Sequence, residues 1–120
     1  MSFWKRLFTK PYATVRAHEV MPLLDVGAVL LDVREPHEWR AGHAPKARHI
    51  PLDQLPERLS EVPRGRTVVT VCRSGMRSRQ AAKLLASQGR QVANLTGGMH
   101  AWARAGLPVV VKGGRTGQVA

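Results

Sequence analysis

Apolar positions along the chain follow two different spacings, and each change of spacing marks a boundary between predicted elements. Continuous apolar runs, which suit buried parallel strands, occupy residues 28–33, 67–72 and 91–95. Apolar residues three or four positions apart, as on one side of a helix, occur over residues 16–26 and 78–88. The pattern therefore predicts three strands and two main helices.

Shorter helices are predicted between these elements from their start and stop signals. Pro36 near the beginning and Gly42 just past the end delimit a helix over residues 35–41. Two more short helices are predicted over residues 52–60 and 99–105, with loops over residues 42–51 and 63–66. Strands that alternate with helices predict an α/β fold, in which helices cover both faces of a parallel sheet. Ligands then bind beside the carboxyl ends of the strands.

The length and composition fit one domain, because the chain has 120 residues and 43% of them are hydrophobic. We expect this domain to span residues 14–111, between a basic N-terminal extension (1–13) and a flexible, glycine-rich tail (112–120). The extension alternates apolar and basic residues, so docking on a membrane or a partner is an alternative to packing against the domain. Since no apolar run could span a bilayer and no secretory signal is present, we expect a cytoplasmic protein without stable membrane anchoring.

The excess positive charge is concentrated in the second half of the chain. Residues 1–61 contain nine Lys and Arg and all eight acidic residues, whereas residues 62–120 contain ten Lys and Arg and no acid. A field of this sign attracts small anions, nucleic acids and anionic membranes, so charge alone does not select a partner. Because basic and aromatic residues are not interleaved as in an RNA-binding motif, we do not expect nucleic acid.

The only cysteine, Cys72, stands between a predicted strand and a predicted helix, followed by Arg-Ser-Gly-Met-Arg. Backbone N–H groups of such a loop converge on one point, and the positive end of the following helix faces the same point. Gly75 permits unusual backbone angles there, and Arg73 and Arg77 add positive charge. We therefore predict a lowered pKa for Cys72, caused mainly by the helix terminus and the loop amides. A buried structural cysteine is the alternative, which the polar residues that follow disfavour.

Three segments of the chain resemble signatures of the rhodanese family. Residues 31–35 (LDVRE) are similar to the first signature, residues 71–78 (VCRSGMRS) to the active-site loop, and residues 95–102 (LTGGMHAW) to the closing signature. Residues 42–45 (GHAP) and 49–51 (HIP) also match a loop that recurs in the family. The segments occur in the family's order, and the resemblance covers about residues 14–111.

The resemblance implies a single rhodanese-like domain with a five-stranded parallel sheet, helices on both faces and no cofactor. It also implies a two-step transfer, in which the Cys72 thiolate takes sulfur from thiosulfate or a similar anion and its persulfide gives the sulfur to cyanide or a thiol. Arg73 is the first candidate for binding the donor anion, and Arg77 is the second. The remaining candidate residues are Ser74, Gly75 and Met76 in the substrate-binding loop, with Ser78, Asp32 and Arg34 in support. The spacing of the histidines predicts no metal site.

Several alternatives stay open at this point. Asp32 and Arg34 could be a purely structural pair rather than a brace for the loop. Related phosphatases of this fold use a loop one residue longer, and the four residues between Cys72 and Arg77 suit a sulfur atom better than a phosphate ester. The protein could also relay sulfur from a partner protein, or sense oxidants through the same cysteine without turnover.

Overall fold

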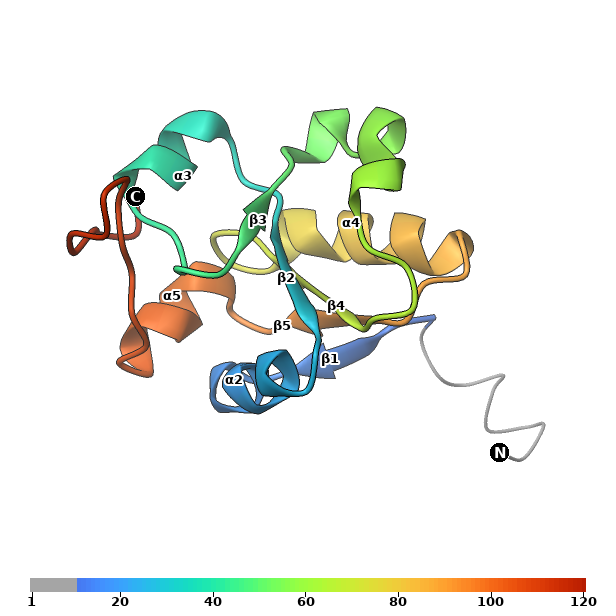
Figure 1. Cartoon of the computed structure of the whole chain (residues 1–120), viewed down its shortest axis with the longest axis horizontal. Coiled ribbons are helices and arrows are strands. Elements are labelled where there is room, and N and C mark those ends of the chain that lie inside the picture. The colour runs from blue at the N-terminus through green and yellow to red at the C-terminus, as the bar shows by residue number, and fades with distance from the viewer. Residues whose placement is uncertain (1–10) are drawn as a thin grey trace.

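A computed structural model, which describes residues 11–120, shows a five-stranded parallel sheet surrounded by helices (Figure 1). The strands are ordered β1-β5-β4-β2-β3. Their bounds are Ala13–Val15 (β1), Val29–Asp32 (β2), Arg48–His49 (β3), Val68–Val71 (β4) and Val92–Leu95 (β5). The α-helices are Ala17–Asp25 (α2), Pro36–Ala41 (α3), Met76–Ser87 (α4) and Gly98–Arg104 (α5), and two 3₁₀ helices are Leu52–Gln54 (η1) and Pro56–Glu61 (η2). This architecture confirms the predicted fold class.

The three strands predicted from apolar runs form the middle of the sheet. Every residue of β2, β4 and β5 is buried. Such strands carry apolar side chains on both faces, which is why they appear in the sequence as continuous runs rather than as alternations. Because β4 lies between β5 and β2, the residue that follows it reaches the middle of the sheet's carboxyl edge.

Each face of the sheet packs against its own group of helices. On one face, Leu85 of α4 and Leu55 between η1 and η2 belong to one core cluster. On the other face, Val20 of α2 and Trp102 of α5 belong to a second cluster. Both groups are visible in Figure 1, with α4 and the 3₁₀ helices on one side of the strands and α2 and α5 on the other. The two-sided cover explains why the central strands are buried on both faces.

The two outer strands, β1 and β3, do not follow from the hydrophobic pattern. They contain three and two residues, and neither includes a fully buried position. A strand this short and this exposed leaves no period in the sequence that could identify it. Only the resemblance to a known family implied that the sheet has five strands.

The prediction of one short helix over residues 52–60 is wrong. The segment forms two 3₁₀ helices, and Arg58 has non-helical backbone angles (φ −116°, ψ 18°) at a kink. Pro56 lacks the N–H that a continuous α-helix would need at that position. The helix predicted from residue 78 begins two residues earlier, at Met76.

The two ends of the chain differ in how far the structure describes them. Residues 1–10 lie outside the described residues, and so does most of the predicted basic extension; within its last part, Tyr12 is buried in the core. The tail folds back beside α3 (Figure 1), and the Gln118 N–H donates to the Ala41 carbonyl at 3.1 Å. The mobility expected for residues 112–120 therefore stays a prediction, and these contacts oppose it. Across residues 11–120, no helix has the length and apolar character needed to span a bilayer.

Candidate active site

Cys72 lies directly after β4, at the carboxyl edge of the sheet and before the first residue of α4. Its side chain is buried, with 1% of the residue exposed. The chain leaves the sheet at Cys72 and turns through Gly75 into α4, so the cysteine is the first residue of a short loop between β4 and α4. The position confirms that the loop meets the edge where ligands of parallel sheets bind.

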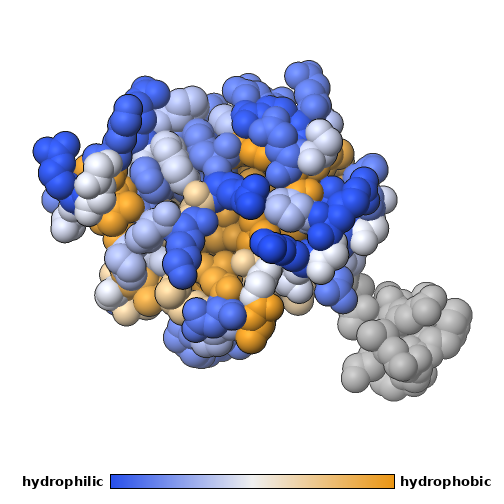
Figure 2. Space-filling model, viewed as in Figure 1, coloured by the Kyte–Doolittle hydropathy of each residue, from blue (hydrophilic) through white to orange (hydrophobic). Residues whose placement is uncertain are grey.

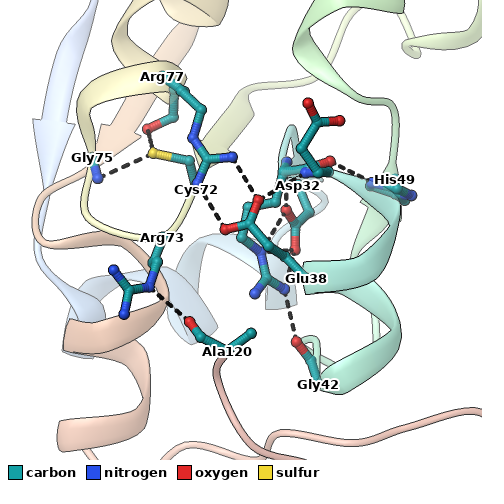
Figure 3. A network of polar contacts seen from close by, with 12 residues as sticks. Asp32, Glu38, Gly42, His49, Cys72, Arg73, Gly75, Arg77 and Ala120 are labelled. Atoms are coloured by element: carbon teal, nitrogen blue, oxygen red, sulfur yellow. Dashed lines mark hydrogen bonds and ion pairs between the residues drawn. The ribbon is translucent and has the colours of Figure 1, made fainter.

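The Cys72 sulfur accepts hydrogen bonds from the loop and from the first turn of α4 (Figure 3). The Gly75 N–H donates to Sγ at 3.1 Å, and the Ser78 hydroxyl donates at 3.3 Å. Burial by itself raises the pKa of the Cys72 thiol, but the Ser78 hydroxyl and the backbone N–H groups of Ser78, Gly75 and Ser74 lower it by more. The net result is a pKa below the usual value for cysteine, as predicted. The sequence analysis did not foresee that the Ser78 hydroxyl is the largest of the lowering contributions.

The loop presents its N–H groups to the sulfur because its carbonyl groups are held elsewhere. The Met99 N–H of α5 donates to the Cys72 carbonyl at 2.8 Å, and the His100 N–H donates to the Arg73 carbonyl at 3.1 Å. Gly98 allows this approach, since a Cβ on it would lie 2.7 Å from the carbonyl carbon of Arg73. The beginning of α5 therefore orients the loop from outside the site.

A second anchor comes from β5, the strand next to β4. The Asn94 side-chain amide donates to the Gly75 carbonyl at 3.3 Å, and its oxygen accepts from the Thr70 hydroxyl at 3.0 Å. Asn94 is buried, so an unpaired amide there would be costly. Neither Asn94 nor Gly98 was predicted as a site residue, although a polar residue inside an apolar strand and the paired glycines of the third signature were available signals.

Gly75 is needed at its position because its backbone occupies the left-handed region. Its φ is 107°, which a residue with a Cβ rarely adopts. This conformation turns the chain sharply after Ser74 and directs the Gly75 N–H toward the sulfur. The prediction that Gly75 provides conformational freedom is confirmed.

Arg77 pairs with an acid that the sequence analysis did not identify. Its two terminal nitrogens donate to the two carboxylate oxygens of Glu38 at 2.6 and 2.8 Å, which joins α4 to α3 beside Cys72 (Figure 3). The hydrogen bonds from Arg77 lower the pKa of Glu38 to about 2, despite the opposing effect of burial. No local pattern indicated this pair, because its members stand 39 positions apart.

The other predicted substrate-binding residues lie at the rim of the loop. Arg73 is exposed, and its Nε donates to the backbone oxygen of Ala120 at 2.7 Å. Ser74 is also exposed, and Met76 is 66% exposed although its side chain is apolar. The rim therefore combines cationic and apolar groups above a buried sulfur.

Asp32 and Arg34 form a fully buried pair at the end of β2 rather than a contact with Cys72. Arg34 donates twice to Asp32 Oδ2, at 2.8 Å through Nη2 and 3.1 Å through Nε. Nη2 also donates to the Gly42 carbonyl at 2.7 Å, so the pair holds the connection around α3 in place. The pair therefore lies next to α3, the helix that carries Glu38.

Within residues 11–120, no group of three or more His, Cys, Asp and Glu side chains could hold a metal ion. His43 and His49 lie instead against Trp39, with ring centroids 3.6 and 4.8 Å from the indole and nearly parallel planes. Trp39 is therefore part of a half-buried aromatic stack, whereas Trp102 is a core residue, 1% exposed.

Comparison with known proteins places this geometry in a family. The family described as "Rhodanese-like domain" matches residues 16–105. A protein from Allochromatium vinosum described as a sulfurtransferase is 48% identical over 87 residues, which cover 72% of this chain and 81% of that protein. The thiosulfate sulfurtransferase GlpE of Actinobacillus pleuropneumoniae is 30% identical over 103 residues, which cover 84% and 95% of the two chains.

A solved structure shows the same fold. The crystal structure of a rhodanese-related protein from Thermoplasma volcanium superimposes with a TM-score of 0.79 at 29% identity, covering 84% of this chain and all of the other. The match in sequence spans the strands β2 to β5, the Cys72 loop and the α5 segment that orients it. With these segments in the family's arrangement, the chain belongs to the rhodanese-like domain family, whose matched relatives include sulfurtransferases.

Proposed function

We propose that this protein is a sulfurtransferase that carries sulfane sulfur as a persulfide on Cys72, with thiosulfate or a similar anion as donor. The observation that carries the proposal is the surroundings of the buried Cys72 sulfur, where N–H and O–H donors converge and lower the pKa of the thiol. The relative GlpE, described as a thiosulfate sulfurtransferase, supports thiosulfate as the donor.

In the first step, the Cys72 thiolate attacks the outer sulfur of thiosulfate. A bond forms between the two sulfurs, the S–S bond of thiosulfate breaks, and sulfite leaves with the bonding electron pair. The loop amides and the Ser78 hydroxyl, which stabilise the thiolate, then face the persulfide. Donors that are already oriented stabilise developing negative charge without reorganisation during the reaction.

In the second step, a nucleophile removes the outer sulfur. Cyanide or a thiolate attacks that sulfur, the persulfide bond breaks, and the electron pair returns to Cys72 as a thiolate. The products are thiocyanate or a new persulfide, and the enzyme is ready for another donor. The two half-reactions predict ping-pong kinetics.

The two arginines of the loop have different roles in the proposed reaction. Arg77 shares its charge with Glu38, whereas Arg73 is exposed at the rim of the loop. We assign the first contact with the donor anion to Arg73, and we assign to Arg77 the placement of the α4 side of the loop. Arg73→Ala is expected to raise KM for thiosulfate more than it lowers kcat, as loss of a binding contact does.

The direct test is intact-protein mass spectrometry of the wild type and Cys72→Ala after incubation with thiosulfate. The expected result is a gain of one sulfur in the wild type only, reversed by cyanide with formation of thiocyanate. Cyanide reversal is needed because a sulfinic acid adds nearly the same mass as a persulfide. If a folded wild type with a reactive thiol gains no sulfur, thiosulfate is not its donor; stable oxidation without transfer from any sulfane donor would indicate a redox sensor instead.

A further inference from the structure

The C-terminal segment that follows α5 forms a small hairpin over residues 109–117, called here the C-terminal hairpin. The Val111 N–H donates to the Arg115 carbonyl at 2.8 Å, and the Gly117 N–H donates to the Val109 carbonyl at 2.8 Å. Its turn contains Gly113 and Gly114, which both have positive φ. The hairpin lies beyond residue 105, where the match to the family ends.

The hairpin is fitted closely against the end of α3. A Cβ on Gly117 would lie 2.8 Å from the Ala41 carbonyl oxygen and 3.0 Å from the Cα of Gly42. Backbone hydrogen bonds in both directions join Val110 to His43, at 2.9 and 2.8 Å. Close approach of two glycines together with a paired backbone fixes where the hairpin side chains lie.

This docking creates a hollow of about 600 Å³ between the hairpin and α3. The lining residues are Trp39, Arg40, His43, Val111, Lys112 and Arg115. Its character is apolar in part, through Trp39 and Val111, and cationic through three exposed side chains. Figure 2 shows hydrophobic surface framed by hydrophilic side chains at the edge of the molecule where the C-terminal segment lies.

The positive charge of the hollow is not neutralised within the part of the chain that the structure describes. Among residues 11–120, no ion pair includes Arg40, Lys112 or Arg115. No acidic residue follows Glu61 in the sequence, and none lines the hollow. An apolar centre with several cations around it is complementary to a segment that carries carboxylates and an aliphatic side chain.

Two neighbours of the hollow contact the Cys72 loop, although no residue of the loop lines the hollow itself. On α3, Trp39 lines the hollow while its neighbour Glu38 pairs with Arg77. The residues that follow the hairpin reach Arg73, whose Nε donates to the backbone oxygen of Ala120 at 2.7 Å (Figure 3). A segment bound in the hollow would therefore be connected to the rim of the loop through α3 and through the residues that follow the hairpin.

We propose that this hollow is a docking site for an acidic segment of a protein whose thiol exchanges sulfur with Cys72; the inference rests on the proposed function. In the step it serves, the partner thiolate attacks the outer sulfur of the Cys72 persulfide, which leaves a partner persulfide and a Cys72 thiolate. A protein segment fits better than single-stranded RNA, because the Trp39 indole already lies parallel to two imidazoles rather than offering an open stacking platform.

Binding is tested first, without sulfur chemistry. The probe is a short fluorescent peptide with several glutamates, one leucine and a serine in place of the thiol, compared with the same peptide carrying lysines instead of glutamates. Fluorescence anisotropy should show salt-sensitive binding of the glutamate peptide only. The triple variant Arg40→Glu, Lys112→Glu, Arg115→Glu should weaken this binding by about tenfold or more.

The matched control is the triple variant Arg64→Glu, Arg66→Glu, Lys83→Glu. These three residues are exposed and do not line the hollow, and replacing them with glutamate changes the net charge by the same amount as in the first triple variant. If the control loses as much affinity as the first triple, the attraction is a property of the whole charge and the docking site is rejected. A single-stranded oligonucleotide of the same charge is also tested as a competitor of the glutamate peptide. If it competes equally well, and its binding is lost in the first triple variant only, the hollow binds nucleic acid and the proposal is overturned.

Sulfur transfer is tested next, with cysteine restored in the peptide. Persulfidated protein should transfer to the glutamate peptide with a kcat/KM about tenfold above the lysine peptide, and the first triple variant should lose this preference relative to the control triple. Sulfur transfer to cyanide is measured in the same samples to separate the two proposals. If no persulfide forms, the proposed function is contradicted. The docking site is still judged by the anisotropy result. Binding without any transfer preference would show that the hollow does not serve sulfur exchange.

Discussion

The Cys72 loop and the C-terminal hairpin are both held by closely packed glycines, but they present opposite kinds of groups. The loop directs backbone N–H groups inward to a sulfur that is 1% exposed. The hairpin directs the charged side chains of Lys112 and Arg115 outward, where water screens them. Stabilising charge on a single atom therefore uses fixed, buried dipoles, whereas attracting a larger partner uses long-range surface charge.

The two regions should therefore respond differently to mutation. A change in the loop should alter the pKa or the reactivity of Cys72, and a change in the hairpin should alter partner capture and leave the thiol as it was. The loop is also tied to β5 and α5, so its variants should cost more stability. Four variants test these expectations.

Gly98→Ala should have the largest effect, because the new Cβ would press on the carbonyl groups of Cys72 and Arg73. We expect a loss of about 1–3 kcal/mol in the free energy of unfolding, as for an overpacked site, together with a large loss of thiocyanate formation. Urea unfolding and the cyanide assay measure the two effects. Gly89→Ala is the control, since Gly89 also has a positive φ (81°) but no atom within 4 Å of its Cβ position. Equal losses in the two variants would mean that backbone strain, rather than the contact with the loop, is responsible.

Ser78→Ala should raise the pKa of the Cys72 thiol, because the hydroxyl makes the largest of the contributions that lower it. At neutral pH the thiolate fraction should fall several-fold, and the rate of alkylation by iodoacetamide should fall with it. The pH dependence of alkylation is the measurement, and its midpoint should move to higher pH than in the wild type. Ser87→Ala, in the last turn of the same helix, should leave the profile unchanged. An unmoved midpoint in Ser78→Ala would assign the lowered pKa to the backbone amides alone.

Glu38→Gln should change the acid sensitivity of the fold. The folded state lowers the pKa of Glu38 from 4.5 to about 2, so its carboxylate stabilises the protein fully above pH 4.5 and loses this contribution as the pH falls toward 2. After allowance for the partly exposed Arg77, we expect the variant to be less stable at neutral pH by about 1–2 kcal/mol. Chemical denaturation at neutral and acid pH should show this difference shrink between pH 4.5 and 2.

The exposed pair Arg58–Glu61 provides the control for this prediction. Glu61→Gln should have a smaller effect at neutral pH, because water screens that pair. A difference between the wild type and Glu38→Gln that stays constant down to pH 2 would show that packing, rather than the charge of Glu38, stabilises the α3–α4 contact.

Gly117→Ala should have the smallest effect on the fold and a selective effect on the hairpin. Its Cβ would lie 2.8 Å from the Ala41 carbonyl oxygen, so the hairpin should separate from α3. We expect a stability change below about 1 kcal/mol, because the segment is at the surface, but faster tryptic cleavage after Lys112 and Arg115. Gln118→Ala is the control, because it removes an exposed side chain and keeps both Gly117 and the backbone hydrogen bond to Ala41. Cleavage at the wild-type rate in Gly117→Ala would show that the hairpin does not depend on this close approach.

The central sheet and the reactive loop could be predicted from the sequence because their signals are local. The buried strands β2, β4 and β5 need apolar side chains on both faces, which leaves continuous runs. The segment from Cys72 to Ser78 contains the cysteine, the glycine with positive φ and two of the groups that donate to the sulfur. Adjacent residues in a strand, turn and helix bring these donors close to the sulfur, while Asn94 and the beginning of α5 hold the loop in that position.

Local patterns and the family resemblance were thus enough to predict the fold class, the sulfur chemistry we propose and the lowered pKa of Cys72. Contacts between residues far apart in the chain arise only in the folded protein: Asn94 with Gly75, Glu38 with Arg77, and the hairpin with α3. The glycines of the tail predicted mobility because composition reflects only the local flexibility of the backbone. The contact between Gly117 and Gly42, which are 75 positions apart, forms only when the tail packs against α3. Contacts between distant segments leave no period or spacing in the sequence, since their geometry exists only after the sheet has brought the segments together.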